Sequence, residues 1–245
     1  MNYKLTISYD GKSYDGWQKQ GNTDRTIQGK LETLLSRLDG SEVKVQGAGR
    51  TDAGVHAKAQ VCNAVLSSKW NEEELRDTIN SYLPMDIAVT DVKEAPDRFH
   101  ARLNAVGKTY KYRIFTGKVM NVFERNYVFN YGKKLSCDKM KTAASYLIGA
   151  HDFKAFCANK HMKKPTVRTI EDISFIQKED EIEITYYGNG FLYNMVRIIT
   201  GTLIEIGEGK KTPESIKDIL ESKERSNAGF TAPANGLILW SVDYE

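Results

Sequence analysis

Two short stretches near the start of the chain decide its fold class. Residues 1–9, MNYKLTISY, alternate apolar and polar side chains with the period of a β-strand. Residues 27–38, IQGKLETLLSRL, have the spacing of an amphipathic helix that ends before Gly40. Its apolar side chains share one face: Ile27, Leu31, Leu34, Leu35 and Leu38. Strands interleaved with amphipathic helices are typical of an α+β protein.

Helix signals recur along the rest of the chain. Asn71 and Glu74 resemble a capping box, and Pro84 ends the helix that they open. We expect four of its residues to face inward: Leu75, Ile79, Tyr82 and Leu83. Thr212 as N-cap, with Pro213 in the first helical position, opens another helix. Two more are predicted, one after Ser136 and one from about Phe191 to Ile206.

The predicted strands lie between these helices. They cover residues 43–46, 59–66, 87–92, 108–115, 169–177, 181–187 and 237–244. The charged turn at residues 178–180 indicates a hairpin. No low-complexity linker divides the chain, so we expect two α+β lobes, residues 1–104 and 105–245, that share a large interface.

The composition of the 245 residues is that of an ordinary globular protein, with 40% hydrophobic and 27% charged residues. Disordered, collagen-like and coiled-coil proteins are excluded. The N-terminus is not a signal peptide, and no 18-residue uncharged apolar run occurs, so we expect a cytoplasmic protein without a membrane segment. The three cysteines, one of them Cys157, form no disulfide framework. Cys157 and His161 have ligand-like spacing, but no second pair joins them, and a buried thiol with a surface histidine is the better interpretation.

The densest cluster of unusual residues is the stretch GAGRTDAGVH at residues 47–56, with three glycines in eight positions. Glycine at this density indicates a sharp turn or a close backbone approach. The stretch fits neither phosphate loop: Val55 and His56 stand where a P-loop needs Lys-Ser/Thr, and the dinucleotide fingerprint lacks its third glycine. What remains is the carboxylate of Asp52 beside Arg50, either a catalytic pair or a turn-capping aspartate with a surface arginine.

A second anomaly is Arg197, the only charged residue between Asn189 and Ile204. Its neighbours in the predicted helix are apolar. An arginine buried there keeps its charge and needs a carboxylate or a phosphate as partner. The alternative is that its side chain snorkels to solvent from a partly exposed helix.

The net charge of +3 argues on its face against a polyanionic partner, but the charges are unevenly distributed. Residues 98–118 contain six Lys or Arg and no acid, with Tyr110 and Tyr112 interleaved. Residues 153–170 contain five more and no acid, while acidic residues gather between Glu171 and Glu183. Basic runs with aromatics are typical of a nucleic-acid groove. Two ordinary solvated faces are the alternative.

Taken together, these segments resemble the tRNA pseudouridine synthase A family over nearly the whole chain. The resemblance is carried by an ordered set of motifs: Tyr9-Asp10-Gly11, Gly16-Trp17-Gln18, Thr26-Ile27-Gln28, residues 49–57, Leu83-Pro84-Met85-Asp86-Ile87, Phe99-His100-Ala101-Arg102, residues 108–112, Gly149-Ala150-His151-Asp152-Phe153, Arg168-Thr169-Ile170, residues 191–197 and residues 231–237. The stretch around Asp52 is the strongest single element.

The resemblance implies an isomerase that converts uridine to pseudouridine in the anticodon stem-loop of tRNA, at positions 38, 39 and 40. It further implies a homodimer that needs no cofactor and no metal. The implied fold consists of two ferredoxin-like lobes with a central mixed or antiparallel sheet and the catalytic cleft between the lobes.

The resemblance also assigns roles to residues. Asp52 matches the nucleophilic aspartate, Arg50 its neighbouring arginine, Tyr110 the active-site tyrosine and Arg197 the arginine that pairs with the aspartate. Tyr110 also serves substrate binding, for which four further residues are expected: Leu237, Arg102, Lys111 and Arg168.

Two other functions are weighed against this one. A non-catalytic RNA chaperone would use the same basic groove, but it would have no reason to keep Asp52, Tyr110 and Arg197. A carboxylate-based glycosidase lacks a clear second carboxylate near Asp52. Ala64, where the family often has an aromatic residue or histidine, and the lysine-rich stretch 153–168 depart from the family pattern and leave open which RNA is selected.

Overall fold

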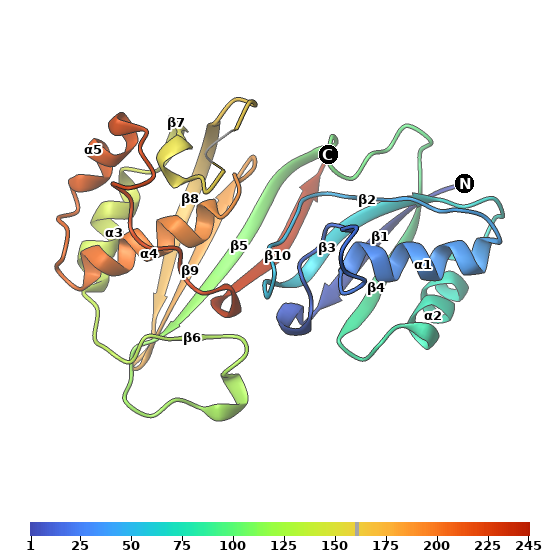
Figure 1. Cartoon of the computed structure of the whole chain (residues 1–245), viewed down its shortest axis with the longest axis horizontal. Coiled ribbons are helices and arrows are strands. Elements are labelled where there is room, and N and C mark those ends of the chain that lie inside the picture. Colours follow the sequence, from blue (N-terminus) through green and yellow to red (C-terminus); the bar gives the residue numbers. More distant parts are fainter. Residues whose placement is uncertain (160–161) are drawn as a thin grey trace. The chain divides into compact units, whose positions relative to one another are not determined.

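The computed structural model describes residues 1–159 and 162–245, which divide into two compact units (Figure 1). Unit 1 consists of residues 1–106 and 238–245, and unit 2 consists of residues 107–237. The expected second lobe ran from residue 105 to residue 245. The difference at the C-terminal strand arises because Ile238 and Leu239 pair in parallel with His56 and Ala57 of unit 1.

Unit 1 is an α+β unit. Its elements are β1 (Asn2–Tyr9), a 3₁₀ turn η1 (Gly11–Ser13), α1 (Ile27–Asp39), β2 (Val45–Gly47), β3 (His56–Val65), α2 (Glu72–Tyr82), β4 (Ile87–Ala95) and the last strand, β10 (Leu237–Tyr244). Strands β4, β1 and β3 are antiparallel neighbours, and β2 and β10 pair with different parts of β3. The order β4-β1-β3-β2 with two connecting helices is ferredoxin-like, and the parallel strand β10 makes the sheet mixed.

The helices of unit 1 form where the apolar pattern predicts them. The Thr26 hydroxyl caps α1 by accepting from the Gly29 N–H, and Gly40, at φ 72°, ends the helix in the left-handed conformation that glycine adopts readily. The Asn71 side chain caps α2 as expected. Tyr82 was expected to face inward but is exposed, because it lines an open groove beside α1 rather than the core.

Unit 2 is also an α+β unit, with α3 and α4 side by side (Figure 1). Its elements are β5 (Ala105–Phe115), η2 (Val122–Glu124), β6 (Phe129–Asn130), α3 (Cys137–Ser145), β7 (Gly149–Asp152), η3 (Phe153–Phe156), β8 (Val167–Gln177), β9 (Glu181–Gly188), α4 (Met195–Gly207), α5 (Ser215–Ser222) and η4 (Ala234–Gly236). The strand order is β5-β9-β8-β7, and β8 and β9 form the predicted hairpin.

Two predicted helix starts in unit 2 are wrong. The helix predicted from Phe191 begins only at Met195, because the backbone at Asn194 adopts a left-handed conformation at φ 59° and turns there. The helix predicted from Thr212 begins at Ser215. The Thr212 carbonyl instead accepts from the Ser215 N–H and hydroxyl in a preceding turn. The first of these differences matters for function, since it places a turn directly before Arg197.

Candidate active site

The loop that carries Asp52 connects β2 to β3 in unit 1. We call residues 48–55 the Asp loop. Its first residues are tied to β3, since the Ala48 N–H donates to the Val61 carbonyl (2.8 Å) and the Gln60 side chain donates to the Gly49 carbonyl (3.0 Å). A turn closes after Asp52, whose carbonyl accepts from the Val55 N–H (3.1 Å). The two ends of the loop are therefore fixed by the strands that it connects.

A second segment, residues 9–17, braces the middle of the Asp loop. The Tyr9 hydroxyl and the Thr51 hydroxyl are hydrogen-bonded at 2.8 Å, and both side chains are buried. The Trp17 N–H donates to the Thr51 carbonyl (3.0 Å), and the Gly54 N–H donates to the Tyr14 carbonyl (3.2 Å). These contacts hold the backbone on both sides of Asp52.

The close approach of the two segments requires glycine. Gly16 has φ +96°, and a Cβ there would lie 2.7 Å from the Thr51 carbonyl oxygen. A Cβ at Gly47 would lie 2.5 Å from Nε1 of the buried Trp17. The glycine density seen in the sequence therefore reflects a packed and braced loop. Within that loop Asp52 is half-buried and Arg50 is exposed, so the loop presents two opposite charges on a firm support.

His56 anchors the exit of the Asp loop. Its ring is buried at the start of β3, and its Nδ1 accepts from the Gly11 N–H at 3.1 Å. The sequence alone gives residues 9–18 no individual roles. Their glycines and aromatic side chains, next to a glycine-rich loop, are the signal that would have identified them as its braces.

Arg197 lies in the first turn of α4 in unit 2, and its guanidinium is fixed by hydrogen bonds to neighbouring residues. Its Nε donates to the Ala232 carbonyl (2.7 Å), and its Nη1 donates to the Asn194 side-chain oxygen (3.0 Å). The Ala232 N–H in turn donates to the Arg197 carbonyl (3.1 Å). The guanidinium is half-buried and fixed in place, so it does not simply extend along the helix surface into solvent.

The segment that holds Arg197 crosses α4 at very short range. We call residues 229–233 the strap. The Gly229 N–H donates to the Thr202 hydroxyl (2.8 Å), and a Cβ at Gly201 would collide with the Phe230 carbonyl. At the far end of the strap, the buried Tyr112 hydroxyl donates to the Pro233 carbonyl (2.7 Å). Small residues at the crossing thus let the strap reach Arg197.

Tyr110 and Leu237 are both largely buried. Tyr110 lies on β5 with 7% of its surface exposed, opposite Tyr186 of β9. Its ring meets Phe191 edge to face, with centroids 5.2 Å apart. Leu237 is the first residue of β10 and is 5% exposed. Packing of this kind orients the Tyr110 ring, as a stacking or proton-transferring residue requires.

Comparison with known proteins identifies the family of this chain. A family model described as tRNA pseudouridine synthase matches residues 5–104 and 143–245, which include Asp52 and Arg197. The chain belongs to the tRNA pseudouridine synthase family. The family predicted from the sequence motifs is therefore confirmed. Tyr110 lies between the two matched ranges, so the family model does not bear on it.

Curated relatives of this pseudouridine synthase match over almost the full length. A protein of Bacillus sp. (strain KSM-64), named tRNA pseudouridine synthase A, is 49% identical over 243 residues, which cover 99% of both chains. One from Bacillus anthracis, named tRNA pseudouridine synthase A 2, is 46% identical over 99% of both chains. One from Clostridium acetobutylicum, named tRNA pseudouridine synthase A, is 44% identical with the same coverage.

The basic residues expected to bind RNA differ in their surroundings. Arg102 is exposed in the turn after β4. Lys111 forms an ion pair with Glu183 (2.8 Å), and neighbouring Arg113 forms one with Glu181 (2.7 Å). Arg168 is half-buried and donates from Nη1 to the Val167 carbonyl (2.6 Å). The basic run at 98–118 is thus free of acids in sequence but is partly neutralised across the sheet.

The remaining sequence expectations concern metals and membranes. Cys157 is buried, whereas His161, its suggested partner, and Lys160 of the second basic run lie outside the described residues. Residues 1–159 and 162–245 contain no group of three or more His, Cys, Asp or Glu side chains that could hold a metal ion. Over the same ranges, every helix falls short of the length and apolar character needed to cross a bilayer.

Proposed function

We propose that this protein converts uridine to pseudouridine at positions 38, 39 and 40 in the anticodon stem-loop of tRNA, as a cytoplasmic homodimer. Family membership carries the reaction and its tRNA substrate. The stem-loop positions and the homodimer are part of the proposal. The observation that supports the site most directly is the braced Asp loop, which presents Asp52 within a range matched by the family model.

The reaction breaks one bond and forms one. The N1–C1′ glycosidic bond of uridine is cleaved, the freed uracil turns, and a C5–C1′ bond forms. The proton leaves C5 and N1 gains one, so no oxidant, reductant or co-substrate is consumed. We assign Asp52 as the nucleophile, which adds to the sugar or to the uracil ring and is released at the end. A braced loop suits this role, because the carboxylate must meet its target in one orientation.

We assign the positive charge beside this carboxylate to Arg197. A nearby guanidinium favours the ionised form of a carboxylate, which a nucleophile requires. The bonds to Ala232 and Asn194 support the assignment, because they hold the guanidinium in one place. Arg197 then stabilises the aspartate without having to be ordered on binding.

Tyr110 and Arg50 complete the proposed catalytic set. The target base must leave its stack to be reached, at a cost of a few kcal/mol. The exposed Arg50 is suited to take the vacated space or to bind the displaced phosphate. Tyr110 would stack on the uracil and move the C5 proton. Leu237 would line the uracil pocket, and Arg102, Lys111 and Arg168 would contact RNA phosphates.

The first experiment replaces the nucleophile. Asp52→Ala should lower tritium release from tRNA carrying [5-³H]uridine by more than about 1,000-fold, in line with loss of a residue that forms the covalent bond. Asp24→Ala, an exposed carboxylate in the same unit, is the matched control and should retain activity. Carbodiimide-dependent primer stops then map the modified positions. Undiminished modification by Asp52→Ala would overturn the assignment.

Two further outcomes test the rest of the proposal. Wild-type protein that binds tRNA tightly but releases no tritium would favour the non-catalytic RNA chaperone. Primer-extension stops outside positions 38 to 40 would show that the enzyme modifies other uridines than those proposed. Light scattering on the purified protein should give twice the 27.7 kDa chain mass. A monomer at assay concentration would contradict the proposed homodimer.

A further inference from the structure

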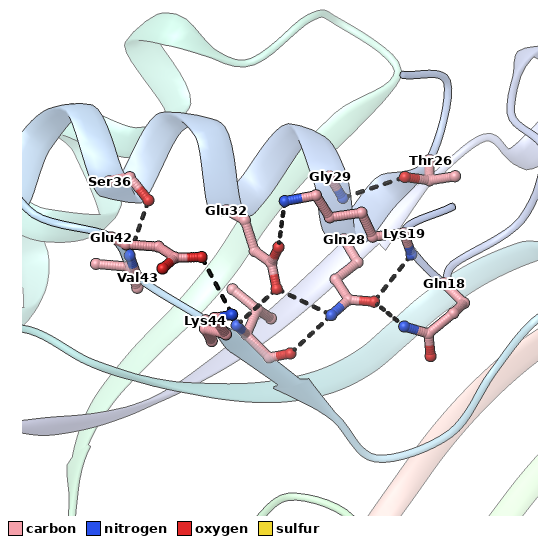
Figure 2. A network of polar contacts seen from close by, with 11 residues as sticks. Gln18, Lys19, Thr26, Gln28, Gly29, Glu32, Ser36, Glu42, Val43 and Lys44 are labelled. Atoms are coloured by element: carbon pink, nitrogen blue, oxygen red, sulfur yellow. Dashed lines mark hydrogen bonds and ion pairs between the residues drawn. The ribbon is translucent and has the colours of Figure 1, made fainter. Parts of the chain in front are cut away.

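The segments that hold the Asp loop meet at one side chain outside it, Gln28 of α1 (Figure 2). Its Nε2 donates to the Glu32 carboxylate (2.9 Å) and to the Val45 carbonyl (3.1 Å). Its Oε1 accepts from the Gln18 side chain (2.7 Å) and from the Lys19 N–H (3.0 Å). All four hydrogen-bonding positions of this amide are therefore used.

Glu32, one turn further along α1, completes the arrangement. It is only 7% exposed, and its Oε1 also accepts from the Val45 N–H (3.1 Å). Its Oε2 forms an ion pair with Lys19 (3.1 Å). A buried carboxylate is tolerated when it is paired and hydrogen-bonded, as it is here. We call Gln28 and Glu32 together the clip, and Figure 2 shows it joining α1 to β2 and to residues 18–19.

The clip is connected to the Asp loop by two routes. Val45 belongs to β2, which leads directly into the Asp loop at Ala48. Residues 18–19 follow Trp17, whose N–H holds the Thr51 carbonyl next to Asp52 (3.0 Å). The backbone adds to the second route, since the Gln28 N–H donates to the Trp17 carbonyl (2.9 Å). Both the entrance of the loop and its brace are thus fixed to the same helix.

We propose that Gln28 and Glu32 are positioning residues for Asp52, and that their loss lowers turnover without weakening tRNA binding. The inference rests on the proposed function for its kinetic readout. The clip is built from side chains that reach two separate segments. One leads into the Asp loop at Ala48, and the other holds the Thr51 carbonyl beside Asp52. A displacement of the nucleophile by about 1 Å is enough to cost up to about 100-fold in rate.

The experiment compares Gln28 with Asn80, a second side-chain amide in the same unit that joins a helix to a strand. Asn80 of α2 donates to the Val89 carbonyl (2.8 Å) and accepts from the Val89 N–H (2.8 Å), so it joins a helix to β4 as Gln28 joins one to β2. Gln28→Met and Asn80→Leu each remove the amide's hydrogen bonds to the strand while keeping the side chain's bulk. Both should lower the midpoint of thermal unfolding by similar amounts.

Only the change at Gln28 should reach the active site. We expect Gln28→Met to lower kcat by about 10- to 100-fold, with KM for tRNA within about twofold of the wild type. Asn80→Leu should keep wild-type kcat well below its unfolding temperature. Equal kcat losses in the two variants, or an unchanged kcat in Gln28→Met, would overturn the proposal.

Hydrogen exchange gives a readout that is independent of activity. Peptides covering residues 48–55 should exchange faster in Gln28→Met than in Asn80→Leu or the wild type, because the loop opens more often. Unaltered exchange there would also overturn the proposal. If the wild type releases no tritium from tRNA, the proposed function fails while the exchange measurement still decides the role of the clip.

A conservative change provides the rescue. Glu32→Gln keeps the shape and the acceptor for Val45 and Gln28 but loses the charge that pairs with Lys19. It should retain kcat within about threefold, whereas Glu32→Leu should match Gln28→Met, since it removes the acceptor. A loss in Glu32→Gln as large as that in Glu32→Leu would show that the hydrogen bonds to β2 are not what positions the loop.

Discussion

The Asp loop and the first turn of α4 each carry one charged residue of the proposed site, and they are anchored in different ways. The Asp loop is held through its backbone and through Thr51, by contacts on both sides of Asp52. Arg197 is itself an anchor, because its guanidinium binds the strap at Ala232 and the turn at Asn194. The contacts described in the first region come from the loop backbone and Thr51, and those in the second come from the charged side chain itself.

The largest difference between the two regions should appear when the charged residues themselves are replaced. We expect Arg197→Leu to stay folded, to lose about 100-fold or more in turnover, and to lose about 2 kcal/mol of unfolding free energy, since a buried carbonyl loses a charged donor. Asp52→Asn, which keeps the shape of the side chain, should cost less unfolding free energy than Arg197→Leu, about 1 kcal/mol or less. Urea unfolding followed by circular dichroism measures both.

Equal stability losses in Arg197→Leu and Asp52→Asn would remove this distinction. Normal turnover in Arg197→Leu would show that the arginine serves only to hold the strap. Arg197→Lys is a useful intermediate, because it keeps the charge but cannot reproduce the geometry of the two bonds.

A smaller effect is expected from the support of the Asp loop. Gly16→Ala should lower turnover by about 10-fold and stability by about 1–3 kcal/mol, because the new Cβ would sit 2.7 Å from the Thr51 carbonyl oxygen at a positive φ. The matched control is Gly40→Ala, where φ is also positive (+72°) but no atom lies within 4 Å of the added Cβ. It should cost only the backbone strain, about 1 kcal/mol, and leave turnover unchanged.

The outcome of that pair separates strain from contact. Equal turnover in Gly16→Ala and Gly40→Ala would show that the approach of residue 16 to Thr51 is not needed to place Asp52. The comparison requires assays below the unfolding temperature of both variants, with the folded fraction checked by circular dichroism.

The smallest effect concerns a device that the two regions share, a buried tyrosine. Burial raises the pKa of Tyr9, which holds Thr51, and of Tyr112, which holds the strap. A tyrosine whose pKa is raised in the folded state contributes stability that is present below pH 10 and is lost as the pH rises above it. We therefore expect stability to fall above about pH 10, with tyrosinate absorbance rising together with loss of circular dichroism.

Single variants show which region gives way. Tyr9→Phe and Tyr112→Phe each remove a hydrogen-bonded hydroxyl and should cost about 1 kcal/mol at neutral pH. Tyr9→Phe should loosen the Asp loop and Tyr112→Phe the strap, as hydrogen exchange of the two segments would report. Tyrosine ionisation well below the unfolding transition would contradict the burial of these hydroxyls.

Much of the local structure could be predicted from the sequence, because it depends on local chemistry. The first helix, with its cap at Thr26 and its end at Gly40, follows from a 3.6-residue pattern and two terminal residues. The hairpin around residues 178–180 follows from alternation and a charged turn. The start of α4 could not be read in the same way, since the apolar pattern continues through Asn194 while the backbone turns there.

Contacts between residues far apart in the chain could not be predicted from the sequence. Windows 98–118 and 171–183 look like a basic and an acidic segment, but β5 and β9 are antiparallel neighbours, and their register brings Lys111 and Arg113 against Glu183 and Glu181. Likewise, glycine density pointed to the Asp loop, whereas the braces at Tyr9 and Trp17 depend on contacts across more than thirty residues. Charge and spacing along the chain do not reveal such partners.

The pairing of β10 with β3 has a consequence for when the enzyme can become active. Residues 238 and 239 pair with His56 and Ala57, directly after the Asp loop, yet they follow all of unit 2 in the chain. Because a ribosome makes the chain from its N-terminus at about 5–20 residues per second, the loop is synthesised roughly 10 to 40 seconds before its neighbouring strand exists. A nascent chain therefore carries the Asp loop in an unfinished sheet, and unit 1 is completed only when β10 has emerged.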